Sequence, residues 1–215
     1  MKSRLRWMDE SGIDVAVLTN NTQVLTKSVQ GKDDFGLTTW IRWNDELAEV
    51  ERQHPDRFVA SPSIPIFDAK TALNELERVV STNEAKAVII QPLKWRIDQG
   101  YLDPFYEKLN DLRLPLFFHP VNTDLVVDKA VDEMRGVYGF AFNTTIALSC
   151  FMTSGILDKY PHLKLVIPHL GGALPFLLGR LDLKYDTGNY QASRPPSEYF
   201  GNFYFDVVAY SKKAV

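Results

Sequence analysis

Two histidines hold positions in the sequence at which an imidazole could do chemistry. His119 follows the apolar run 116–118, and His169 follows the apolar run 165–167 after one proline. An imidazole at the end of a buried strand can bind a metal ion or transfer a proton near neutral pH. The alternative is a pair of core histidines whose nitrogens are satisfied by backbone carbonyl groups. Two histidines at equivalent strand ends favour the functional interpretation.

Three further features could complete a site beside His169. Gly171 and Gly172 precede an expected helix, where free N–H groups could hold a phosphate, although the same glycines would equally allow a tight turn beside a crowded site. Arg180 lies among apolar residues of that helix, so a buried guanidinium would need a carboxylate, a neighbouring subunit or an anionic substrate as its partner. Asp206, near the end of another apolar run, is a candidate pocket residue.

The other histidines and the single cysteine predict no chemistry. His54 and His162 lie in polar turns beside prolines, at the opposite ends of their strands, and are interpreted as solvated surface residues. Cys150 is followed by Phe151 and Met152 in an apolar segment, so it is interpreted as a core residue.

Apolar runs and helical patterns alternate along the whole chain. Most of the runs are continuous, which is typical of strands covered on both faces of a parallel sheet. The expected strands are 14–20, 57–64, 86–91, 115–119, 164–169 and 203–208. Helices are expected around 40–50, at 69–80 after an Asp68 N-cap, at 103–112 with Asp103 as cap, at 144–160 weakened by Gly155, and at 173–185 with Pro175 in the first turn.

This alternation fits two α/β architectures. A doubly wound open sheet would need a glycine-rich turn after its first strand, and the residues 19–22 are not such a turn. A (β/α)₈ TIM barrel needs eight strands, whereas six are found. We therefore expect an incomplete barrel with His119 and His169 facing one cavity.

Composition excludes several classes of protein. The 215 residues carry 24 Lys and Arg against 27 Asp and Glu, a net charge of −3 without the basic excess of a nucleic-acid binder. One cysteine excludes a disulfide-stapled scaffold and favours a reducing, cytoplasmic location. No apolar run approaches the length of a membrane helix, and the first residues lack the apolar core of a signal peptide, so no membrane partner is expected.

Several motifs together resemble one enzyme family. They are Leu116-Phe117-Phe118-His119-Pro120, Thr144-Thr145-Ile146-Ala147, the Tyr160-Pro161-x-Leu163-Lys164 segment, and His169-Leu170-Gly171-Gly172-Ala173-Leu174-Pro175-Phe176 followed by Gly179-Arg180. In this order and spacing they resemble the amidohydrolase-related family, most closely its branch of aminocarboxymuconate semialdehyde and resorcylate decarboxylases. Segments 4–14 and 55–58 are also similar to that family, so the resemblance covers essentially the whole chain.

The resemblance implies a metal-dependent barrel enzyme with one divalent metal, often zinc. By that comparison His119 is the metal ligand from strand five, and His169 is the strand-six histidine that acts as general acid or base. Arg180 matches an arginine that reaches a neighbouring subunit's site to hold a substrate carboxylate, which implies a homodimer. Asp206 matches a strand-seven position and not the family's metal aspartate.

The sequence departs from the family pattern at both ends. It contains neither the His-x-His pair of strand one nor the aspartate segment of strand eight, so the six strands correspond to strands two to seven and residues 1–215 are interpreted as a fragment of one barrel domain. We expect a carboxy-lyase, or a hydrolase of a small lactone or ester, acting on a small carboxylated aromatic or unsaturated substrate. The alternative is a catalytically incomplete fragment, because a catalytic zinc normally needs three protein ligands.

Overall fold

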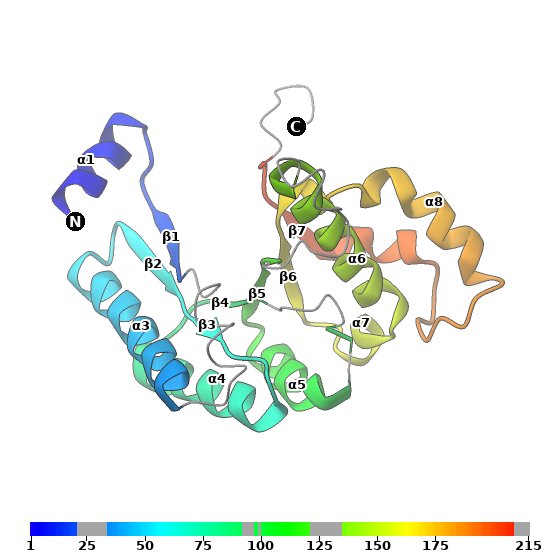
Figure 1. The fold of residues 1–215 in the computed structure, drawn as a ribbon, viewed down its shortest axis with the longest axis horizontal. Coiled ribbons are helices and arrows are strands. Elements are labelled where there is room, and N and C mark those ends of the chain that lie inside the picture. The colour runs from blue at the N-terminus through cyan, green and yellow to red at the C-terminus, as the bar shows by residue number, and fades with distance from the viewer. Residues whose placement is uncertain (21–33, 92–96, 99, 121–134, 209–215) are drawn as a thin grey trace.

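The computed structural model describes residues 1–20, 34–91, 97–98, 100–120 and 135–208 (Figure 1). Its strands are β1 (Ala16–Thr19), β2 (Phe58–Ser61), β3 (Ser63–Ile64), β4 (Val88–Ile90), β5 (Pro115–Phe118), β6 (Lys164–Ile167) and β7 (Phe203–Phe205). Its α-helices are α1 (Lys2–Glu10), α3 (Asp34–Gln53), α4 (Ala69–Asn83), α5 (Asp103–Leu112), α6 (Phe140–Thr153), α7 (Ile156–Lys159) and α8 (Leu174–Tyr185). The helical turns are η1 (Gly100–Leu102), η3 (Arg135–Gly139), η4 (His169–Gly171) and η5 (Pro196–Asn202). Among the described helices, none combines the length and the hydropathy that a bilayer crossing requires.

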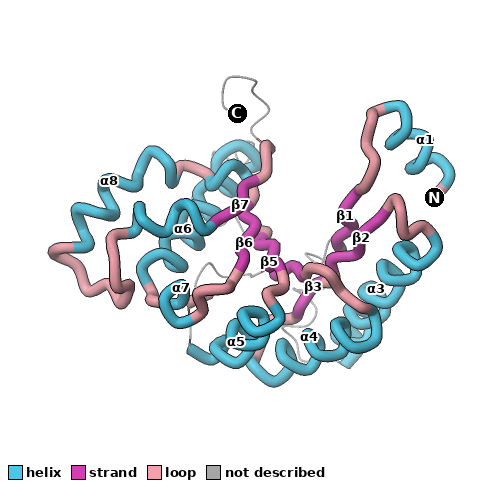
Figure 2. Tube along the Cα trace, turned by 180° about the vertical axis from the view of Figure 1, so that it is seen from behind, coloured by secondary structure: helices cyan, strands magenta, loops and turns pink. Residues whose placement is uncertain are grey.

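The strands follow one another in chain order, and every pair is parallel. β1 pairs with β2, and a five-stranded sheet runs in the order β3-β4-β5-β6-β7. In Figure 2 these strands form a curved wall, with α3, α4 and α5 along its outer side. A doubly wound sheet would reverse its strand order at a switch point, and the described strands show no such reversal. The prediction of an incomplete (β/α)₈ barrel, whose strands are arranged in chain order from β1 to β7, is therefore confirmed.

The two faces of the five-stranded sheet have different surroundings. Leu116, Leu165 and Phe203 lie side by side in β5, β6 and β7 and are buried in the hydrophobic core against the helices. The next residues along the strands lie on the opposite, inner face. There Val166 of β6 is opposite Tyr204 of β7, and Tyr204 is 60% exposed. Side-chain alternation therefore points one set of residues at the helices and the other into the space that the curved wall partly surrounds.

The observed elements correct three details of the expected ones. The strand predicted at 57–64 is two strands, because Pro62 has no N–H to donate to a ladder, although its carbonyl still accepts from Ile89 at 2.9 Å. The helix predicted at 144–160 begins earlier, as α6, and gives way to α7 after Gly155 adopts a φ of +78°. Asp103 is the first residue of α5 rather than its cap, because η1 leads directly into the helix. Asp68 is confirmed as the cap of α4, since its carboxylate accepts from the Thr71 N–H.

Asn44 fastens α3 to β3 and α4. Its side chain is fully buried. Its Oδ1 accepts from the backbone N–H of Ser63 at 2.9 Å and from the Asn20 amide at 3.1 Å. Its Nδ2 donates to the Ser63 carbonyl at 2.9 Å and to Glu75 Oε1 at 2.7 Å. An asparagine side chain can make four hydrogen bonds, and all four are made here.

Candidate active site

His119 and His169 lie together at the carboxyl ends of neighbouring strands. His119 directly follows β5, where its N–H donates to the Ile90 carbonyl at 3.0 Å, and His169 follows β6 after one residue. The centroids of the two imidazoles are 5.9 Å apart, with 59° between the ring planes. Both residues are half-buried. The structure thus brings together the two histidines that the sequence singled out.

The ring of Phe140, the first residue of α6, lies against both imidazoles. Its centroid is 6.2 Å from that of His119 and 6.0 Å from that of His169, and it is nearly parallel to the His169 ring, at 19°. This aromatic wall removes water from one side of each imidazole.

Burial lowers the pKa of both histidines below the ordinary value. For His169 the neighbouring His119 lowers the pKa further, because two positive charges at this distance repel. The carboxylate of Asp206 acts in the opposite direction and raises both pKa values. Neutral imidazoles therefore prevail at pH 7, the form that can bind a metal ion or accept a proton.

A backbone turn in unusual geometry carries His169. His169 and Leu170 have φ values of +57° and +50°, and Gly171 and Gly172 continue at +77° and +65°. A positive φ is energetically unfavourable for residues other than glycine, and such strained residues are frequent at functional sites. Asp206, just after β7, holds the turn by accepting from the Leu170 N–H at 3.1 Å.

Gly172 fits only because it has no side chain. A Cβ at this position would lie 2.1 Å from the Ala141 carbonyl oxygen and 2.6 Å from Thr145 Oγ1, both in α6. The glycine pair therefore serves the tight turn beside a crowded site that the sequence offered as the alternative to a phosphate cradle.

The first turns of α6 dock onto the segment 169–173 through two threonines. Thr145 Oγ1 donates to the Ala141 carbonyl and accepts from the Ala173 N–H, each at 2.8 Å. Thr144 Oγ1 lies 3.0 Å from His169 Nδ1. The sequence identified these threonines only as part of a family motif and did not predict their contacts, because no local pattern indicates a contact across 25 residues.

The described residues do not complete a metal site. Within the described part of the chain no group of three or more His, Cys, Asp or Glu is arranged to hold a metal ion. His119 has the neutral imidazole that a divalent metal binds. Asp206 Oδ1 already accepts hydrogen bonds from the N–H groups of Leu170 and Val208. A three-ligand catalytic centre is thus not formed by these residues alone.

Arg180 lies on the exposed surface of α8. Phe176 and Leu183, one turn on either side of it along the helix, are 90% and 73% exposed. The possibility that this arginine is buried among its apolar neighbours is therefore wrong, because those neighbours on its own side of the helix face solvent as well.

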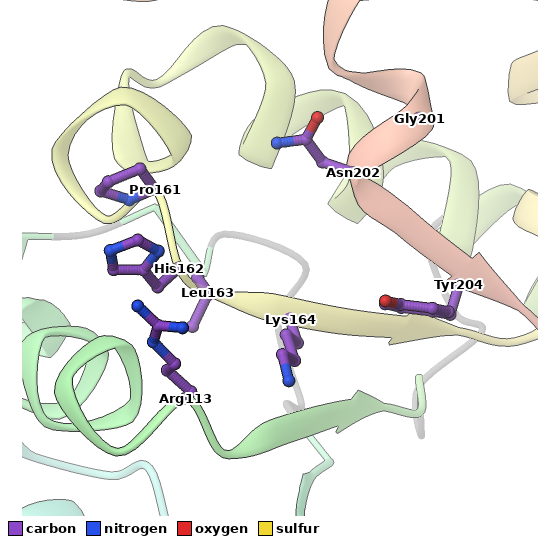
Figure 3. Close-up of a pocket in the computed structure, with 8 residues that line it drawn as sticks. All are labelled: Arg113, Pro161, His162, Leu163, Lys164, Gly201, Asn202 and Tyr204. Atoms are coloured by element: carbon purple, nitrogen blue, oxygen red, sulfur yellow. The ribbon is translucent and has the colours of Figure 1, made fainter.

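A hollow of about 240 Å³ opens at the other end of the same strands (Figure 3). Its lining is Arg113, Pro161, His162, Leu163, Lys164, Gly201, Asn202 and Tyr204. Amino-terminal strand ends in barrels serve stability, whereas chemistry takes place at the carboxyl ends. The hollow is therefore separate from the histidine pair, and His162 is exposed there as the sequence predicts.

Comparison with known proteins gives one consistent result. The amidohydrolase family matches residues 28–212. The gamma-resorcylate decarboxylase of Polaromonas sp. is 30% identical over an alignment of 224 positions, gaps included, that covers 94% of this chain and 66% of that protein. The crystal structure of 5-carboxyvanillate decarboxylase from Sphingomonas paucimobilis superposes with a TM-score of 0.79 at 28% identity, over 94% of this chain and 63% of that one.

A third relative was solved with a metal and an inhibitor. The dihydroxybenzoic acid decarboxylase of Polaromonas sp. holds manganese and 2-nitroresorcinol, and it superposes with a TM-score of 0.77 at 28% identity, over 94% of this chain and 66% of that one. The chain spans slightly less than two thirds of the length of each of these three relatives.

Proposed function

The chain belongs to the amidohydrolase family, and on that premise we propose that the whole protein is a metal-dependent carboxy-lyase. The reaction is the non-oxidative removal of CO₂ from a small carboxylated aromatic substrate. The observation that carries this proposal is the approach of His119 and His169 at adjacent strand ends, 5.9 Å between ring centroids. The relatives that share this fold and are named as resorcylate, carboxyvanillate and dihydroxybenzoate decarboxylases support the substrate class.

We assign His169 the proton transfer. When the bond between the ring carbon and the carboxylate breaks, its electron pair stays on the ring carbon, and a proton must replace the departing CO₂. A half-buried imidazole held beside the reacting carbon is suited to deliver that proton as a general acid. Because burial lowers its pKa and favours the neutral ring, the imidazole first takes up a proton from solvent and then passes it to the ring carbon.

We assign His119 as one ligand of a divalent metal, zinc by the family resemblance, with manganese as the ion present in a relative. Because the described residues supply no group of three ligands, calorimetric titration of residues 1–215 with either ion is expected to give no tight one-to-one binding. Tight binding that His119→Ala abolishes would show instead that the ligand set is complete within this chain.

Arg180 is proposed to act across a homodimer. The residue is exposed on α8, and Phe176, one turn before it, is 90% exposed. A second copy packed on this helix would cover the apolar side chains and bring the arginine to a substrate carboxylate, which it can bind through two parallel hydrogen bonds. We place the enzyme in the cytoplasm, as one barrel domain, from its single cysteine and its family.

The test is a decarboxylation assay on the whole protein with manganese and 2,6-dihydroxybenzoate, followed by loss of substrate absorbance and release of CO₂. We expect turnover that His169→Ala lowers by about 100-fold or more, with bound metal retained. His162→Ala, at the opposite end of the strands, is the matched control and leaves the rate unchanged.

Two outcomes would contradict the proposal. Hydrolysis of a small ester or lactone without CO₂ release would assign the same site to a hydrolase. Absence of either reaction in the metal-loaded protein would favour a catalytically incomplete chain, an alternative consistent with the lack of a three-ligand group among the described residues.

A further inference from the structure

Among the described residues, the Thr144 side chain has one polar contact, and that contact is the ring of His169. The threonine is fully buried in α6, and its Oγ1 lies 3.0 Å from His169 Nδ1. Its neighbour Thr145 instead donates to a carbonyl one turn back in the helix. Within the described residues, Thr144 Oγ1 has no second acceptor.

This geometry decides which atom carries the proton between the two residues. If Nδ1 carried the hydrogen and donated it to Oγ1, the buried hydroxyl hydrogen of Thr144 would find no acceptor in the described part of the chain, which is costly. If the hydroxyl donates to Nδ1, both the hydroxyl hydrogen and the Nδ1 lone pair are satisfied. In a neutral imidazole one nitrogen carries the hydrogen and the other accepts, so the hydrogen of His169 is then on Nε2.

The ring of His169 is held in this orientation by a single face of α6. Phe140 and Thr144 are four residues apart, so they lie above one another on the same side of the helix. Phe140 stacks on the imidazole at 19° while Thr144 bonds to its edge. The helix itself is fixed to the turn through the contact of Thr145 with the Ala173 N–H.

We propose that Thr144 is a positioning residue that keeps neutral His169 in its Nε2–H tautomer. The imidazole then offers an N–H, not a lone pair, from the nitrogen that is free of Thr144. A ring in that state cannot bind a metal through Nε2, and it can donate a hydrogen bond to a substrate oxygen. The tautomer follows from the geometry alone; its catalytic consequence depends on the function proposed above and deepens it.

The tautomer can be read directly by ¹⁵N NMR of imidazoles in the 215-residue chain labelled at histidine. Spectra are recorded without metal or substrate at about pH 8.5, two units above the ordinary histidine pKa, and His169→Asn identifies the resonances. We expect a protonated Nε2 and an Nδ1 shifted by an accepted hydrogen bond. Thr144→Val should abolish that Nδ1 shift, and Thr144→Ser, which keeps the hydroxyl, should restore it.

Thr153→Val is the matched control, because Thr153 lies on the same helix and bonds to the Ser149 carbonyl. It should leave the His169 spectrum unchanged. A protonated Nδ1 in the wild type, or a wild-type spectrum in Thr144→Val, would overturn the proposal. If Thr144→Val fails to fold, the wild-type and Thr144→Ser spectra still test the proposal, because both must show a protonated Nε2 and a shifted Nδ1.

Activity gives a second and separate readout. If the decarboxylase is active, Thr144→Val should lower kcat by about 10-fold, the size typical of losing a partner that orients a catalytic group, with KM little changed. Thr144→Ser should recover most of the loss. An inactive wild type would refute the proposed function and leave the NMR result standing.

Discussion

Two polar clusters hold strand ends in this molecule, and they are built in opposite ways. In the cluster around Asn44, between α3, β3 and α4, the asparagine is fully buried and uses all four of its hydrogen-bonding positions. The His169 cluster, between α6, β6 and β7, is half-buried and rests on four consecutive residues at positive φ.

The difference separates a structural cluster from a functional one. A buried amide with every partner in place fixes the packing and offers nothing to a ligand. A half-buried imidazole with a lowered pKa, on backbone that only the surrounding structure can hold, has capacity left for chemistry. Substitutions around Asn44 should therefore change the free energy of unfolding, whereas substitutions around His169 should also change the properties of the imidazoles.

Gly172→Ala should have the largest effect. The new Cβ would meet the Ala141 carbonyl oxygen at 2.1 Å, and the positive φ is unfavourable for alanine, so we expect the free energy of unfolding to fall by about 3–5 kcal/mol. Urea denaturation followed by circular dichroism measures this. Gly179→Ala, with nothing near its Cβ in the exposed helix α8, should instead stabilise by roughly 0.5–1 kcal/mol. Equal stability of Gly172→Ala and the wild type would refute the close docking of α6.

Asn44→Ala should follow, at about 3 kcal/mol of lost stability, because it leaves buried partners on Ser63 and Glu75 unsatisfied. Ser63→Ala is the local control. The Ser63 hydroxyl is buried without a partner among the described residues, so its removal should be neutral or slightly stabilising. If Asn44→Ala also changes the ¹⁵N spectrum of His169, the two clusters are not independent and the comparison fails.

Asp206→Ala should lower the free energy of unfolding by about 1 kcal/mol, because the N–H groups of Leu170 and Val208 lose their acceptor. Asp206→Asn keeps an acceptor oxygen and removes only the charge. Since that charge raises the pKa of His119 and His169, their NMR titrations should move to lower pH in Asp206→Asn. A shift to higher pH would contradict the electrostatic assignment.

The pH dependence of stability should be the smallest effect. The pKa of His119 and His169 is lowered in the folded chain, whereas in the unfolded chain it is about 6.5. Below that value the unfolded state takes up protons first, so stability is full above about pH 6.5 and declines as pH falls. Urea midpoints between about pH 7.5 and 5.5 should show the decline, and His169→Ala should reduce it. His162→Gln, whose ring is exposed at the other strand end, is the control.

Much of the fold was predictable because it is written in local patterns. Each apolar run coincides with a described strand, although the run at 57–64 holds two, and the Asp68 cap and the proline of α5 located two helix starts. The histidine pair was predictable because strand ends in such an architecture meet at one edge. The clamp of Asn44 and the bond from Thr144 to His169 were not, since each joins residues 19 to 31 positions apart through packing that no local pattern encodes.

The left-handed turn at 169–172 also bears on the order in which the molecule folds. Residues at positive φ are unfavourable in an isolated segment, so this turn cannot form early from local preference. It must wait until α6 has docked, through contacts that span 25 to 28 residues of chain, and contacts of such separation are closed at an entropic cost. The candidate active site is therefore among the last parts of the sheet to reach its native geometry.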